Sequence, residues 1–118
     1  MIDYPGLDQV RSAALALPQA EERLSHGQPT FFVGGKQFAQ YRAHHHGDER
    51  IVVCVRTSGV DEQSMLIDAD PDLYSRPAYL GPSGWVGINL SADEVDWDHV
   101  ADRLRRSWEL AAPKASRR

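Results

Sequence analysis

The chain has 118 residues, 17 acidic and 13 basic side chains and a formal net charge of −4, which suits one domain with its own core and disfavours non-specific coating of nucleic acid. Its single cysteine, Cys54, excludes an internal disulfide, and no apolar run approaches the roughly 20 residues of a membrane span. The first five residues do not resemble a signal peptide, so we expect a cytoplasmic protein.

The first predicted element is a short amphipathic helix over about residues 5–17. Pro5 suits its first turn and Pro18 ends it. Apolar side chains recur at helical spacing at Leu7, Val10, Ala14 and Leu17. Residues 20–26 show no clear period and are predicted to form a short edge strand.

A first β-hairpin is predicted around Gly34-Gly35. Apolar, β-rich runs flank these two glycines, and the favoured two-residue turn needs a positive φ at both central positions. Pairing across this turn would place Phe31 opposite Phe38 on one face of the sheet.

A second hairpin is predicted from residues 38–42 and 50–56, with its tip at residues 43–49. Ile51, Val53 and Val55 alternate onto one face of the second strand, and Cys54 lies on the other. A reactive thiolate needs an exposed, electropositive niche, so a mid-strand cysteine between valines is interpreted as structural.

A second helix is predicted over residues 61–68, with Met65, Leu66 and Val60 directed inward. A loop and turn then lead to a last strand over residues 85–90.

The final predicted element is a helix that Asp96 caps and Pro113 ends. Its apolar stripe has helical spacing: Trp97, Val100, Ala101, Leu104, Trp108 and Ala111. Opposite charges at i,i+3 and i,i+4 should stabilise its surface through Asp102, Arg105, Arg106 and Glu109. Arg103 has no obvious partner in the sequence and is a candidate for contacting a binding partner.

These elements predict a single two-layer α+β domain over residues 1–113, with three helices on one face of an antiparallel sheet of about five strands. Residues 114–118 form a basic tail. Residues 102–118 hold six basic and two acidic side chains, a charge of +4, whereas the rest of the chain carries −8.

Several segments resemble, in the expected order, the MmcQ/YjbR-like family, and the match runs from about Leu15 to Lys114. The segments are Gly27-Gln28-Pro29-Thr30-Phe31, Gly34-Gly35-Lys36-Gln37-Phe38-Ala39, Tyr79-Leu80-Gly81, Gly84-Trp85-Val86-Gly87 and Val95-Asp96-Trp97 through Trp108. The resemblance implies an α-β(3)-α-β(2)-α fold and DNA binding by a "double wing" of hairpins. The chain departs from the family in its acidic charge and in His44-His45-His46, where a shorter Gly/Asp-type turn is expected.

Side chains near the two hairpins are therefore candidate DNA contacts: Lys36, Arg42, His44, His46, Arg50 and Arg56. Arginine and lysine attract phosphate regardless of sequence, so weak, salt-dependent binding is expected. Asp48 and Glu49 at the same tip oppose it, and solvated hairpin ends remain the alternative. An exposed tip lacks the second shell that orients metal ligands, so no dedicated metal site is predicted.

The alternative function is a binding module for a protein or an anionic small molecule, without a nucleic-acid role. Its candidate cleft combines aromatic and cationic groups: His26, Arg76, Tyr79 and Trp85. Trp85 also fits a core position. No P-loop, dinucleotide fingerprint, nucleophile elbow, CxxC or HExxH motif occurs, so we predict neither catalysis nor a cofactor, and a monomer is favoured.

Overall fold

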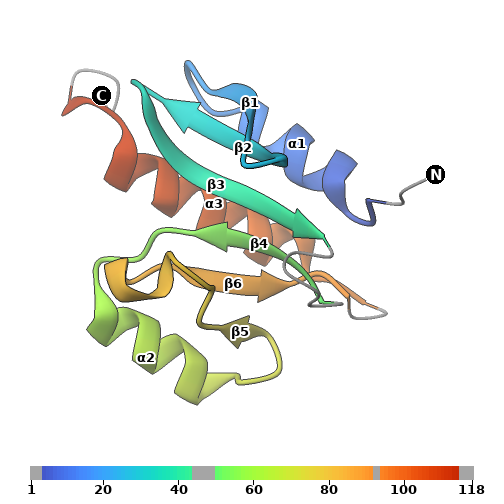
Figure 1. The fold of residues 1–118 in the computed structure, drawn as a ribbon, viewed down its shortest axis with the longest axis vertical. Helices are drawn as coiled ribbons and strands as arrows, with labels where there is room; N and C mark the ends of the chain where they lie inside the picture. The colour runs from blue at the N-terminus through green and yellow to red at the C-terminus, as the bar shows by residue number, and fades with distance from the viewer. Residues whose placement is uncertain (1–3, 44–49, 92–93, 115–118) are drawn as a thin grey trace.

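The computed structural model describes residues 4–43, 50–91 and 94–114. Its elements follow in chain order (Figure 1): α1 (Leu7–Leu15), β1 (Glu21–Ser25), β2 (Gln28–Val33), β3 (Lys36–Ala43), β4 (Ile51–Val55), α2 (Val60–Ala69), β5 (Tyr74–Ser75), the 3-10 turn η2 (Gly81–Ser83), β6 (Val86–Asn89) and α3 (Trp97–Ala111). All strand pairs are antiparallel, in the order β1-β2-β3-β4-β6-β5. The predicted α+β fold is confirmed, with six strands in the sheet.

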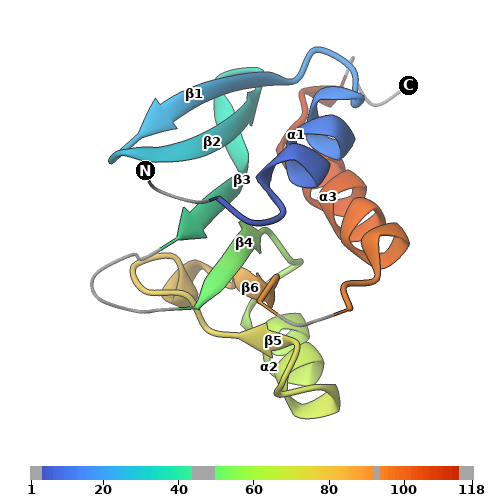
Figure 2. The ribbon, with the colours of Figure 1, turned by 90° about the vertical axis from the view of Figure 1, so that its right-hand side faces the viewer.

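The sheet separates the helices α1 and α3 from the segment that joins β5 to β6. In Figure 2, α1 and α3 lie together on one side of β3 and β4, and the β5–β6 segment lies on the other side. Helix α2 lies beside β5, at the end of the sheet opposite β1, so the predicted arrangement of all three helices on one face holds for α1 and α3 but not for α2. The central strands are therefore covered on both faces.

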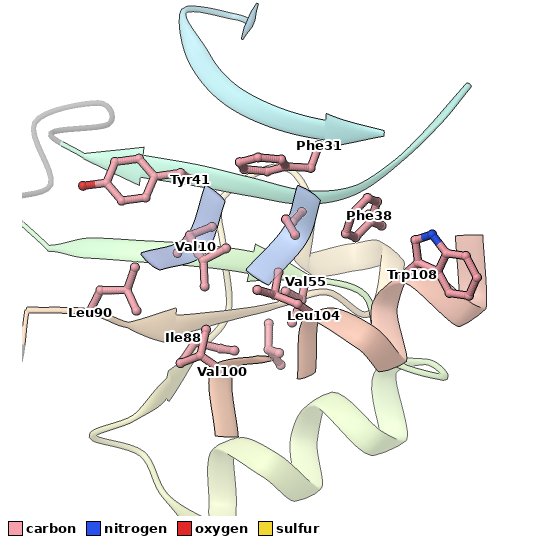
Figure 3. Close-up of a cluster of buried hydrophobic side chains, with 14 of the residues drawn as sticks. Val10, Phe31, Phe38, Tyr41, Val55, Ile88, Leu90, Val100, Leu104 and Trp108 are labelled. Atoms are coloured by element: carbon pink, nitrogen blue, oxygen red, sulfur yellow. The ribbon is translucent and has the colours of Figure 1, made fainter. Parts of the chain in front are cut away.

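The hydrophobic core fills the space between the sheet and the helices α1 and α3 (Figure 3). Val10 from α1 and Leu104 from α3 are fully buried, as are Phe31, Tyr41 and Ile88 from the sheet. Full burial of one such side chain stabilises the fold by about 1.5–3 kcal/mol. The apolar periods of the two predicted helices thus mark their core faces correctly.

The predicted pairing of Phe31 with Phe38 is wrong, because β3 contains a bulge. Phe31 pairs with Ala39 and Phe32 with Gln37, which leaves Phe38 as the extra residue. A bulge bends the strand and breaks its strict alternation, and both Phe38 and Ala39 are fully buried. The hairpin turn itself is as predicted, and β3 pairs with β4 as expected.

The predicted inward face of α2 is also partly wrong. Met65 and Val60 are 61% and 51% exposed, whereas Leu66 is half-buried and Gln63 is fully buried. The Nε2 of Gln63 donates to the carbonyl oxygens of Gly81 (2.8 Å) and Trp85 (2.6 Å). Helix α2 therefore directs an amide inward, because part of the surface it packs against is polar backbone.

The cap of α3 is confirmed, since Asp96 accepts a hydrogen bond from the backbone N–H of His99 (3.1 Å). Arg103 does not face outward as the sequence suggested. Its side chain is buried, Nη1 lies 3.8 Å from Glu62 Oε2 on α2, and Nε has no hydrogen-bond partner among the described atoms. Arg103 thus connects α3 to α2 through a long ion pair.

Candidate functional site

Arg42, a predicted DNA contact, lies in the interior on the sheet face opposite α1 and α3. Its Nε donates to Gln40 Oε1 (2.8 Å) and its Nη1 to the carbonyl oxygen of Ala78 (2.9 Å). The side chain is buried, and its bond to Ala78 connects β3 to the segment between β5 and β6. Arg42 therefore stabilises the interior through these hydrogen bonds and is not available at the surface to bind phosphate.

The other predicted DNA contacts do not form one group. Lys36 is exposed at the first hairpin tip and Arg50 is exposed before β4, whereas His44 and His46 lie outside the described residues. Arg56 is half-buried, and this burial lowers its pKa. The guanidinium carbon of Arg56 lies 5.1 Å from the Trp85 ring centroid, and its Nε donates to the carbonyl oxygen of Gln37.

Three arginines are instead linked in a row by a series of contacts along one end of the sheet. The guanidinium carbon of Arg23 lies 4.1 Å from the Phe32 ring centroid. Phe32 pairs with Gln37, whose carbonyl oxygen holds Arg56.

The row continues through α2, because Gln63 binds both the carbonyl oxygen of Trp85 and the Nε of Arg76 (3.1 Å). We call Arg23, Arg56 and Arg76 the arginine row. Arg23 and Arg76 are exposed, and Arg56 is half-buried.

The arginine row lies in parts of the chain that contain no acidic residue. Residues 23–47, 50–60 and 73–92 hold neither Asp nor Glu. They contain six of the 13 basic side chains: Arg23, Lys36, Arg42, Arg50, Arg56 and Arg76. All 17 acids lie elsewhere, although Glu21 borders the row by pairing with Phe32. This segregation favours a locally cationic surface on an acidic protein, and the sequence alone shows it although no motif marks it.

The predicted ligand cleft is only partly assembled. Gln63 brings Arg76 and Trp85 together, and Trp85 is buried as its core alternative required. Tyr79 is 75% exposed on the β5–β6 segment. His26 lies in the β1–β2 turn, and no described contact joins it to the other three.

Cys54 is a structural thiol, as predicted. It is fully buried and unpaired on β4. Burial raises its pKa to about 11, an effect that the positive charge of Arg42 partly offsets. The thiol is therefore protonated at neutral pH and is neither a nucleophile nor a metal ligand there.

A separate groove of about 440 Å³ lies between α1 and the β1–β2 hairpin. Its lining is partly apolar and partly charged: Tyr4, Leu7, Asp8, Arg11, Glu22, Leu24, Gly27 and Pro29. Arg11 is held by Glu22 through two hydrogen bonds, of 2.6 and 2.8 Å, and lies 3.6 Å from Asp8. With two carboxylates against one guanidinium, this groove does not suit an anion.

The described ranges contain no cluster of three or more His, Cys, Asp or Glu side chains able to hold a metal ion. Within the same ranges, no helix is long and apolar enough to cross a membrane. The predicted ion pairs on α3 are present: Arg105 and Arg106 both bind Asp102, and Arg105 also binds Glu109. The exposed face of α3 is thus largely self-neutralised.

Comparison with known proteins gives a family and a fold. A family model described as YjbR matches residues 15–110. The crystal structure of Deinococcus radiodurans protein DR2400, described by the domain DUF419, superposes with a TM-score of 0.76 and 20% sequence identity, covering 97% of this chain and 86% of that chain. At this identity the likeness shows the fold alone. No curated protein matches the chain.

Proposed function

Because the chain belongs to the YjbR family, we propose that it is a non-enzymatic, monomeric nucleic-acid-binding protein of the cytoplasm, with the arginine row as its phosphate-binding surface. The observation that carries this proposal is the row itself, in which three arginines are held in series on a part of the surface built from acid-free segments. The family resemblance supports DNA as the ligand.

Contacts with aromatic rings orient the guanidinium groups of Arg23 and Arg56 before any phosphate binds. A guanidinium that lies over a ring keeps its N–H groups in its own plane, directed away from the ring, and loses less side-chain entropy when it binds. The planar fork then matches two phosphate oxygens. We accordingly propose contacts along this end of the sheet, and we do not include Arg42, whose guanidinium is engaged internally.

Three phosphate contacts give weak binding that depends strongly on salt. Each contact contributes about −0.9 to the slope of log K against log salt on duplex DNA, and about −0.7 on a single strand. The expected slopes are therefore about −2.7 and about −2.1. Raising the salt from about 20 to about 200 mM should weaken duplex binding roughly 500-fold.

Fluorescence anisotropy of a labelled random duplex and a labelled single strand tests the proposal. The double variant Arg23→Gln/Arg76→Gln removes two contacts and should reduce the duplex slope to about −0.9. The control Arg105→Gln/Arg106→Gln changes the net charge equally, but its arginines are paired on α3, and it should keep the wild-type slope. Absence of binding at about 20 mM salt, or equal losses in both variants, would refute the proposal.

The alternative of an anionic small ligand would use the same arginines, because the groove beside α1 is net acidic. Inorganic phosphate separates the two functions. A small-anion site should bind phosphate without added nucleic acid, and should lose that binding in Arg76→Gln. A nucleic-acid surface should bind single phosphate ions too weakly to detect, because its affinity is the sum of several separate contacts.

A further inference from the structure

Tyr79 occupies a strained backbone conformation. Its φ is +67°, a value that bulky residues rarely adopt. The N–H of Leu80 donates to the carbonyl oxygen of Ala78 (2.8 Å), which makes Tyr79 the central residue of a three-residue turn. Such turns with a positive central φ are rare and strained. Glycine would remove the strain, so the tyrosine at this position requires an explanation.

The ring of Tyr79 does not bury enough surface to explain its position, since the residue is 75% exposed. The turn is held from its two ends instead. On one side, the buried guanidinium of Arg42 binds the carbonyl oxygen of Ala78. On the other, the N–H of Gly81 donates to the carbonyl oxygen of Pro77 (2.8 Å), and the Gly81 carbonyl oxygen accepts from Gln63. Strain that the surroundings maintain in this way is typical of functional positions.

The chemistry around Tyr79 favours an anionic partner with flat rings. Residues 73–92 contain no acid, and Arg76 is exposed in the same segment, three residues before Tyr79. An exposed aromatic ring beside a cation is the arrangement by which proteins bind single-stranded nucleic acid, with bases stacked on the ring and the backbone on the cation. A base inside a duplex offers only its edges, so its faces cannot stack on this ring.

We propose that Tyr79 is a stacking platform for an unpaired base and that Arg76 binds the adjacent phosphate, so that the protein prefers single-stranded over duplex nucleic acid. This inference rests on the proposed function and names its substrate class. The fixed turn supports it, because the backbone that carries the ring is already ordered, so less conformational freedom is lost when a base stacks on the ring.

The test compares a single strand of about 12 nucleotides with the duplex of the same sequence, measured by anisotropy at low salt. Tyr79→Ala removes the ring, and Tyr79→Phe keeps the stacking face without the hydroxyl. Loss of one stacked base should weaken single-strand binding by about 5- to 150-fold in Tyr79→Ala. Duplex binding should stay unchanged, and Tyr79→Phe should bind the single strand like the wild type.

Three results would overturn the inference. If Tyr79→Ala binds the single strand normally while Arg23→Gln/Arg76→Gln does not, the arginine row stands and Tyr79 has another role, such as contacting a protein. If Tyr79→Ala weakens single-strand and duplex binding equally, the residue is a general contact and not a stacking platform. If the wild type binds neither ligand, the proposed function fails as well. Urea unfolding of each variant shows whether the fold is intact, and the exposed position of Tyr79 predicts that it is.

Discussion

Replacing Gly84 by alanine should strongly destabilise the protein, although it adds only one methyl group. Gly84 has a φ of +91°, and a Cβ built there would lie 2.8 Å from the carbonyl carbon of Gly59 and 2.9 Å from its Cα. Both are backbone atoms, so no side chain can move aside. The Thr57 hydroxyl fixes this contact, lying 2.6 Å from the Gly84 carbonyl oxygen and 2.8 Å from that of Gly59.

Two costs combine in Gly84→Ala. A left-handed conformation costs an alanine about 1–2 kcal/mol relative to glycine, and forcing the two backbone segments apart adds about 1–3 kcal/mol. The expected loss is therefore about 2–5 kcal/mol, against a total stability of about 5–15 kcal/mol for a domain. Gly35→Ala is the matched control, because Gly35 has a φ of +81° and a Cβ there would meet nothing within 4 Å.

Urea unfolding, followed by tryptophan fluorescence, measures both variants. With an m-value of about 2 kcal/mol/M, Gly84→Ala should unfold at a midpoint about 1–2.5 M lower than the wild type. Gly35→Ala should lose only about 0.5–1 M. If the two midpoints fall equally, the close approach to Gly59 contributes nothing and the steric argument is refuted.

Three further predictions concern single side chains. Cys54 should resist iodoacetamide at pH 8 until urea unfolds the protein, and rapid modification of the native protein would contradict this. Because the pKa of the thiol rises from 9.0 to about 11 on folding, its contribution to the free energy of unfolding should be lost as the pH rises between those values. The backbone N–H of Ser58, and to a smaller extent Arg103, lower the pKa of Glu62. Glu62→Gln should therefore reduce the free energy of unfolding by about 1–2 kcal/mol at pH 7. The difference from the wild type should shrink as acid protonates the carboxylate, which a pH series of urea midpoints checks. Ser107→Ala removes a buried hydroxyl that donates to the Phe38 carbonyl oxygen and accepts from the backbone N–H of Arg56. Urea unfolding should show a loss of about 1–3 kcal/mol in the free energy of unfolding. The control Ser64→Ala, on the exposed side of α2, should change that free energy by less than about 0.5 kcal/mol.

The parts of the fold that depend on neighbouring residues could be predicted from the sequence. The Gly34-Gly35 turn, the strands on either side of it and the Asp96 cap all follow from contacts within a few residues. The apolar period of α3 identifies its core face for the same reason, because helical spacing alone sets which side chains share a face.

The features that sequence reasoning missed depend on distant partners. The bulge residue Phe38 is bound by Ser107, 69 residues away, and Arg42 binds Ala78, 36 residues away. Gln63 is directed inward because it meets backbone carbonyls, which no hydrophobic pattern can signal. In the candidate site, the strained φ of Tyr79 likewise needs the structure, whereas the segregation of acids from bases did not.

The strand order also has a consequence for how the chain folds as it is made. Strands β1 to β4 are joined in sequence as neighbours, so they can pair soon after they leave the ribosome, through contacts of short sequence separation. β6 must pair with β4 across the intervening α2, and Trp108 of α3 donates to the carbonyl oxygen of Pro18, 90 residues earlier. Helix α1 is made before the meander and can cover part of its apolar face, but the part that packs against α3 stays uncovered until α3 emerges. Chains interrupted before that point should be the species that chaperones hold and that aggregate.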